Sequence, residues 1–132
     1  MPGINITRIN HVGIPITDRK KTLPFYRDLL GISVIPSQVD SEKIVWTQLV
    51  DGAMIHAIEQ ADNWHIAFQV DDIDATRTAL EEAGFEISSD GERHDGQRYV
   101  FVNDPDGNRI EFATASGRIK NSRQADEWGY TS

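Results

Sequence analysis

The alternation of apolar and polar residues in the first half of the chain predicts a strand, a helix and three further strands. Residues 9–16 alternate as a strand does. The apolar stripe of residues 20–30 predicts a helix, with Pro24 tolerated only in its first turn and Gly31 suited to its carboxyl end. The strand-like runs that follow are 32–36, 43–50 and 53–59, with a hairpin turn expected at Asp51-Gly52.

The second half of the chain repeats this order. Residues 65–70 alternate again, and a helix is expected from the capping residues Asp71 and Asp72 to about Ala83. Further strands are predicted at 85–88, 98–103 and 108–113, with a polar loop at 91–96 and a turn at 104–107.

Matching segments indicate an internal duplication. Residues 11–18 match residues 65–72 at an offset of 54, and residues 52–56 match residues 107–111 at an offset of 55. We therefore expect an α+β fold of two βαβββ modules within one domain, 1–132. The predicted parts are module one at 8–60, module two at 64–114 and a polar carboxyl-terminal tail at 115–132.

Composition narrows the possible functions. The chain has 132 residues, a formal net charge of −8 and no cysteine. The acidic balance argues against a nucleic-acid surface, and the absence of cysteine excludes thiolate ligands and a Cys nucleophile. The sequence shows no leader peptide and no apolar run long enough to span a bilayer. A cytoplasmic protein without a membrane or nucleic-acid partner is the expectation.

The duplication places four metal-capable side chains at equivalent positions. It pairs His11 with His65 on the first strands of the modules, and His56 with Glu111 on the last strands. If the two sheets face each other, all four side chains can converge. Imidazole and carboxylate groups suit Zn, Ni, Co, Mn or Fe(II).

Each of these residues also has a simpler interpretation. His11 and His65 could be hydrogen-bonded strand histidines, Glu111 an outward-facing residue, and His56 a polar residue lining a cavity. Their coincidence at duplicated positions favours ligation. Glu59 has the opposite strand parity to His56 and is the weaker candidate.

Other residues are candidates for a substrate cavity or for the surface. Trp46, Tyr99 and Phe101 are expected to line a cavity or the core, with stacking on an aromatic substrate as the alternative, and Gln69 shares a strand face with His65. His94 belongs to a solvated loop or to a mobile lid. Surface roles are expected for Lys20, Lys21, Arg118, Lys120 and Arg123, although the last three could reach an anionic substrate.

Four segments carry a resemblance to a known family. They are residues 9–14, 25–31, 65–72 and 104–111. Over residues 8–114 the chain resembles the vicinal oxygen chelate superfamily, which contains glyoxalase I, bleomycin- and fosfomycin-resistance proteins, methylmalonyl-CoA epimerase and extradiol dioxygenases. The resemblance implies a half-open, eight-stranded barrel of glyoxalase-like fold around a metal, and a homodimer.

The resemblance also implies roles for the candidate residues. His11, His65 and Glu111 fall on the family's ligand positions, and His56 falls on the fourth-strand position, where glyoxalase I has a carboxylate. The metal would be a divalent ion of Fe, Mn, Ni, Co or Zn. Glu111 could act as base by loosening from the metal, and His56 could be a fourth ligand or a general base.

The reaction stays open between classes. Two histidines and one carboxylate are the set expected of extradiol dioxygenases, but Phe101 replaces that group's tyrosine, and Gly13 and Phe101 depart from the fosfomycin-resistance pattern. The leading hypothesis is a metal-dependent lyase, isomerase or dioxygenase acting on a small molecule that chelates the metal through vicinal oxygens. The alternative is a non-catalytic protein, similar to bleomycin-resistance proteins, that sequesters an aromatic small molecule.

Overall fold

The computed structural model describes residues 3–35, 37, 43–93 and 96–115. Residues 116–132 of the predicted tail, including Arg118, Lys120 and Arg123, lie outside these residues. His94 of the predicted loop or lid lies outside them as well.

The chain divides into two compact units. Among the described residues, unit 1 comprises those of 3–10 and 65–115, and unit 2 comprises those of 11–64. The division falls inside the first strand, β1 (Ile6–Ile16). The amino-terminal half of β1 therefore belongs to unit 1 and its carboxyl-terminal half to unit 2.

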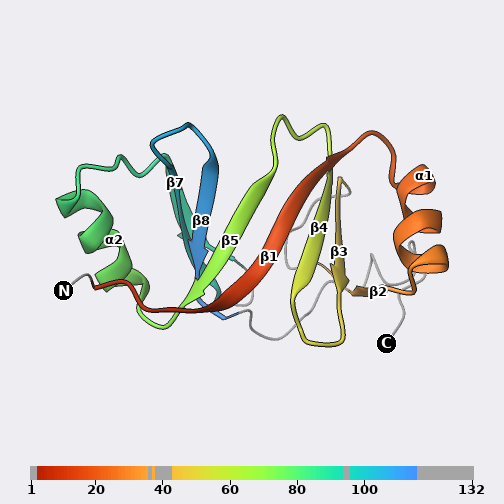
Figure 1. The fold of residues 1–132 in the computed structure, drawn as a ribbon, viewed down its shortest axis with the longest axis horizontal. Coiled ribbons are helices and arrows are strands. Elements are labelled where there is room, and N and C mark those ends of the chain that lie inside the picture. The colour runs from red at the N-terminus through yellow and green to blue at the C-terminus, as the bar shows by residue number, and fades with distance from the viewer. Residues whose placement is uncertain (1–2, 36, 38–42, 94–95, 116–132) are drawn as a thin grey trace. The chain divides into compact units, whose positions relative to one another are not determined.

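Unit 2 contains a helical segment and strands in the order β2-β3-β4-β1 (Figure 1). β1 and β4 are parallel, whereas β2–β3 and β3–β4 are antiparallel. The predicted hairpin between β3 and β4 is confirmed, with Gly52 at a φ of 94° and the Asp51 carboxylate accepting from the Ala53 amide. The elements are α1 (Arg19–Leu23), the π-helical segment η1 (Pro24–Leu29), β2 (Ser33–Ile35), β3 (Ile44–Gln48) and β4 (Met54–Glu59).

The first helical segment is not one regular helix. α1 ends at Leu23 and η1 begins at Pro24, so that proline occupies the first turn of the second segment. Proline lacks an amide hydrogen and disrupts a regular helix at any later position. The segment ends as predicted at Gly31, which has a φ of 72°.

In its described residues, unit 1 contains one helix packed on strands in the order β1-β5-β8-β7-β6. α2 lies along β7 and β8 (Figure 1). The core between helix and sheet contains Val70, Ile73, Leu80, Val100, Val102 and Phe112. The elements are β5 (His65–Val70), α2 (Ile73–Glu82), β6 (Ser89–Glu92), β7 (Arg98–Asn103) and β8 (Arg109–Ala113). The α+β class and the repeated βαβββ order are thereby confirmed.

The sixth strand differs from the prediction. The sequence pattern predicts a strand at 85–88 and a loop from residue 91, but β6 pairs with β7 over Ser89–Glu92. Phe85 and Ile87 pack against the core without belonging to this ladder. All four β6 residues are exposed, so their side chains carry no apolar alternation, and the strand is defined by its backbone pairing.

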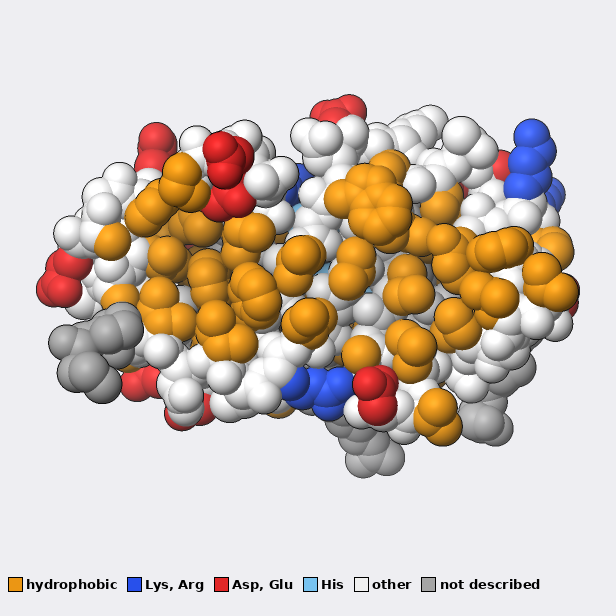
Figure 2. All heavy atoms as spheres, in the orientation of Figure 1, with side chains coloured by type: hydrophobic (Ala, Val, Ile, Leu, Met, Phe, Trp, Pro, Cys, Tyr) orange, Lys and Arg blue, Asp and Glu red, His pale blue; other side chains and the backbone are white. Residues whose placement is uncertain are grey.

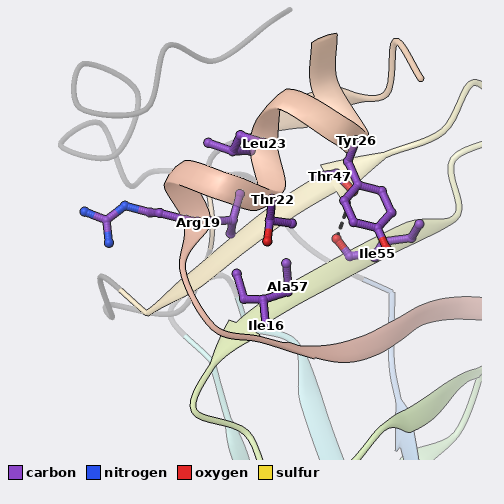
Figure 3. A pocket seen from close by; sticks show the side chains of 9 residues that line it. Ile16, Arg19, Thr22, Leu23, Tyr26, Thr47, Ile55 and Ala57 are labelled. Carbon is purple, nitrogen blue, oxygen red and sulfur yellow. Dashed lines mark hydrogen bonds between the residues drawn. The ribbon is translucent and has the colours of Figure 1, made fainter. Parts of the chain in front are cut away.

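A small apolar pocket lies between the helical segment and the sheet of unit 2 (Figure 3). Its volume is about 10 Å³, close to the minimum that one water molecule needs. Thr47, which lines it, donates its hydroxyl hydrogen to the Ile55 carbonyl at 3.0 Å. The pocket is therefore a packing gap in the core rather than a substrate site.

Large apolar side chains remain exposed in both units. Hydrophobic side chains cover much of the face shown in Figure 2. The exposed residues are Ile6, Ile9 and Ile66 in unit 1, and Phe25, Leu29, Leu30, Leu49, Val50 and Trp64 in unit 2. Within the described residues, no helix combines the length and the apolar character needed to cross a membrane.

The cap of α2 provides a test of the fold. The Asp72 carboxylate accepts from the Ala75 amide at 2.9 Å, as the capping prediction requires. Asp72→Ala should lower the free energy of unfolding by about 1 kcal/mol, because a helix amide loses its acceptor. Urea denaturation measures this loss, with Glu82→Ala as the control at the other end of the helix. Equal stability of the two variants would contradict the capping role.

Candidate functional site

The candidate residues of the second module share one face of the unit 1 sheet. Side chains alternate along each strand, and Phe68, Val100 and Phe112 turn toward α2 in the core. The opposite face receives His65 and Gln69 from β5, Glu111 from β8, and Tyr99 and Phe101 from β7. The sheet thus lies between these candidate residues and the structural core.

His65 and Glu111 form a buried pair on this face. β5 and β8 are parallel, and His65 pairs with Arg109 while Ala67 pairs with Glu111. Glu111 is therefore the diagonal neighbour of His65. The His65 Nε2 atom lies 3.3 Å from Glu111 Oε1, and the Glu111 side chain is 0% exposed. A carboxylate buried so completely requires partners that offset its lost hydration.

A second partner of Glu111 is Arg93, which the sequence reasoning placed only in a polar loop. Arg93 Nη1 lies 3.2 Å from Glu111 Oε2 and donates to Gln97 Oε1 at 3.0 Å. Its guanidinium carbon lies 4.1 Å from the centre of the Tyr99 ring. Gln97 is buried and donates to the Thr114 carbonyl. No local motif signals these contacts, since Arg93 and Glu111 meet only through the pairing of the strands.

The predicted cavity residues of unit 1 surround the same pair. Phe101 contacts the His65 ring edge-on at a centroid distance of 5.6 Å, and Tyr99 contacts Phe101 at 5.7 Å. Gln69 accepts from the Asn10 side chain at 3.0 Å. The aromatic rings shield the imidazole from water on one side, and the amides hold the edge of the face toward β1.

Unit 2 contains a stack of three rings. His56 lies between Trp46 and His11, with centroid distances of 4.0 Å to Trp46 and 3.8 Å to His11. The planes of His56 and Trp46 differ by 7°, and those of His56 and His11 by 19°. All three side chains are buried. The stack fixes the plane of the central imidazole by contact on both of its faces.

Glu59, the weaker candidate of the sequence analysis, takes part in another contact. Its carboxylate pairs with Arg19 at 3.1 Å. The structure thus brings His65 together with Glu111 in unit 1, and His11 together with His56 and Trp46 in unit 2. Arg93, Gln97 and Asn10 are the additional residues that sequence reasoning missed.

The His65–Glu111 pair of unit 1 and the ring stack of unit 2 occupy equivalent positions in the strand registers of their units. In unit 2, His56 on β4 pairs with Gly13 on β1 and with Trp46 on β3. In unit 1, Glu111 on β8 pairs in the same way with Ala67 on β5 and with Phe101 on β7. The offsets of 54 and 55 residues that relate the two halves of the sequence therefore relate their hydrogen-bonded registers as well.

One known protein family matches most of the chain. The model of the Glyoxalase/Bleomycin resistance protein/Dioxygenase superfamily matches residues 8–112. The chain belongs to this superfamily. The resemblance to vicinal oxygen chelate proteins and the predicted glyoxalase-like fold class are thereby confirmed.

Individual members of the superfamily are similar over most of the chain. A lactoylglutathione lyase of Haemophilus influenzae is 30% identical over 122 residues, covering 80% of this chain and 90% of that protein. A variant of Streptomyces coelicolor methylmalonyl-CoA epimerase has a TM-score of 0.68 at 24% identity, covering 84% and 99% of the two chains. A variant of Brevibacterium fuscum homoprotocatechuate 2,3-dioxygenase has a TM-score of 0.69 at 22% identity, covering 91% of this chain and 35% of that one.

The ring stack provides a test by a double-mutant cycle. Trp46→Leu and His56→Leu, alone and combined, should show a coupling free energy of about 0.5–1.5 kcal/mol, because stacked rings interact beyond their buried area. Urea denaturation of the four proteins measures it. A second cycle that combines Trp46→Leu with Leu23→Ala is the control, because Leu23 packs on the opposite face of the same sheet. The stability losses of these two substitutions should be nearly additive. A Trp46–His56 coupling no larger than this control would show that the rings do not support each other.

Proposed function

We propose that the protein is a metal-dependent enzyme acting on a small molecule that binds a divalent ion through vicinal oxygens. His11, His65 and Glu111 would hold the ion, and His56 would serve as a fourth ligand or as a general base. The observation that carries the proposal is the buried His65–Glu111 pair, since it joins two residues of the predicted ligand set.

The chemistry of these side chains fits such an ion. His11, His65 and Glu111 are buried, and each offers one ligand atom, an imidazole nitrogen or a carboxylate oxygen. Nitrogen and oxygen donors of this kind suit Fe(II), Mn, Ni, Co and Zn. A buried carboxylate next to an imidazole is also the arrangement in which a divalent charge would offset the cost of burial.

The bound ion would act as a Lewis acid toward the substrate oxygens. The residues of the chain would perform the remaining tasks. Arg93 would orient Glu111 by holding its second oxygen, and Phe101 would limit the access of water to His65. Trp46 would hold the plane of His56. In the role of a base, His56 would accept a proton at an imidazole nitrogen.

Among the possible reactions, we favour a lyase or an isomerase over a dioxygenase. The lactoylglutathione lyase of Haemophilus influenzae is 30% identical to this chain and covers most of it. The similarity to the dioxygenase, at 22% identity, concerns the fold. Both favoured reactions can proceed by moving a proton next to a substrate oxygen, a task for which His56 and Glu111 are the candidate groups.

Metal titration of ligand variants tests the proposal. We expect the protein to bind one equivalent of at least one ion among Fe(II), Mn, Ni, Co and Zn, measured by calorimetry and elemental analysis. His11→Ala, His65→Ala and Glu111→Ala should each weaken binding by about 100-fold or more, since loss of a supporting group alone costs about 10- to 100-fold. Glu59→Gln, whose carboxylate pairs with Arg19, is the matched control and should bind as the parent does.

His56→Ala separates the two roles of that residue. Weaker metal binding would make His56 a ligand, whereas unchanged binding with lost turnover would make it the base. Oxygen consumption by the metal-loaded protein would favour the dioxygenase branch. Failure to bind any of the five ions would overturn the enzyme and favour the sequestering protein.

The proposal includes a homodimer. Phe25 and Trp64 are exposed and line an open groove of about 750 Å³ on unit 2. Exposed aromatic patches of this kind are typical of interaction surfaces. We expect twice the chain mass by light scattering, and a shift toward the monomer in Phe25→Ser/Trp64→Ser. Val50→Ser, an exposed residue outside the groove, is the control, and a monomeric parent protein would contradict the proposal.

A further inference from the structure

Two arginines lie on the candidate-site face of unit 1, and the proposed ligand set does not use them. Arg93 contacts Glu111 Oε2, and its side chain is 15% exposed. Arg109 precedes Glu111 by two residues on β8, and its guanidinium carbon lies 4.3 Å from the centre of the Phe101 ring. Phe101 contacts both Tyr99, the ring beneath Arg93, and His65. The two guanidinium groups therefore stack on neighbouring rings next to the His65–Glu111 pair.

Arg93 is held from several sides. Gln97 accepts from it, the Tyr99 ring lies against its guanidinium, and Glu111 provides the opposite charge. The position of the Tyr99 ring depends on Gly91, because a Cβ atom at residue 91 would lie 2.7 Å from the Tyr99 hydroxyl oxygen. A cation fixed in this way loses little side-chain entropy when it binds an anion.

The chemistry of Arg93 favours a carboxylate as its ligand. A guanidinium presents five N–H donors in a planar fork that matches a carboxylate, and Arg93 already binds the carboxylate of Glu111. Within the described part of the chain, both polar contacts of Arg93 use the same nitrogen, Nη1. One guanidinium can therefore bridge Glu111 and a second carboxylate.

The negative net charge of the protein makes local positive charge necessary for binding an anion. With a formal net charge of −8, the chain as a whole repels anions. An anionic substrate would need local positive charge at the site. Arg93 and Arg109 provide it beside the residues proposed to bind the ion.

We propose that the substrate carries a carboxylate near its chelating oxygens, and that Arg93 binds this carboxylate with Arg109 as the second cation. This inference rests on the proposed function, because it assumes that the chelating oxygens lie at the ion held by His65 and Glu111. It narrows the substrate class from small oxygen chelators in general to carboxylate-bearing ones.

Two probes with the same chelating group test the inference. Acetohydroxamate chelates a metal ion through its two oxygens and has no carboxylate, and succinohydroxamate has the same chelating group with an added carboxymethyl group that supplies one carboxylate. Calorimetry on the full-length protein, loaded with an ion that it binds, should show succinohydroxamate to be about 10- to 100-fold tighter, the range of a charge-assisted hydrogen bond. The measured quantity is the ratio of the two dissociation constants, which cancels any change in the hydroxamate contact itself.

Substitutions of the two arginines test which of them causes the preference for succinohydroxamate. Arg93→Gln should bring the ratio close to one, and Arg93→Lys should restore part of it, because lysine keeps the charge without the fork. Arg109→Gln should reduce the ratio by a smaller factor. Arg98→Gln is the matched control, since Arg98 pairs with Asp74 at the surface, and it should leave the ratio unchanged.

The outcomes separate this inference from the proposed function. Binding of acetohydroxamate without a preference for succinohydroxamate would overturn the inference and leave the metal site standing. A preference that survives in both Arg93 variants would also overturn it. Should Arg93→Gln fail to fold, Arg93→Lys against the parent protein decides. Absence of any bound ion would overturn the proposed function and this inference together.

Discussion

The parallel pairing between the first and last strands of each module is the constraint on which the candidate site depends. In unit 2 it places His56 diagonally beside His11, and in unit 1 it places Glu111 beside His65. Side chains on a strand alternate with a period of two. A register shift of one residue would therefore turn His56 or Glu111 from the site face toward the helix side.

The buried charge of Glu111 determines what surrounds it. A carboxylate without exposure to water is costly unless other groups replace its hydration. His65 approaches one of its oxygens, and Arg93 approaches the other. Arg93 in turn depends on Gln97 and Tyr99 for its position. One carboxylate is thereby linked, directly or through Arg93, to an imidazole, an amide and an aromatic ring.

The elements that sequence reasoning predicted well are those with a local signal. Residues 65–70 alternate in hydrophobicity, and Asp72 is a favourable cap, so β5 and the start of α2 follow the prediction. The prediction was wrong where side chains carry no such signal. β6 consists of exposed residues joined to β7 by its backbone. At Pro24 the sequence does carry a signal, because proline is tolerated only in a first turn, and the helical segment changes there to π-helical geometry.

The sequence by itself determined the duplicated modules, the candidate ligand residues and, through strand parity, the face that each residue occupies. These properties depend on residues close in the chain or on matching positions in the two halves. Only the tertiary structure decided the stack of Trp46, His56 and His11, and the contact of Arg93 with Glu111. Such contacts depend on strand register and side-chain orientation, which result from packing and hydrogen bonding between segments that are distant in the sequence.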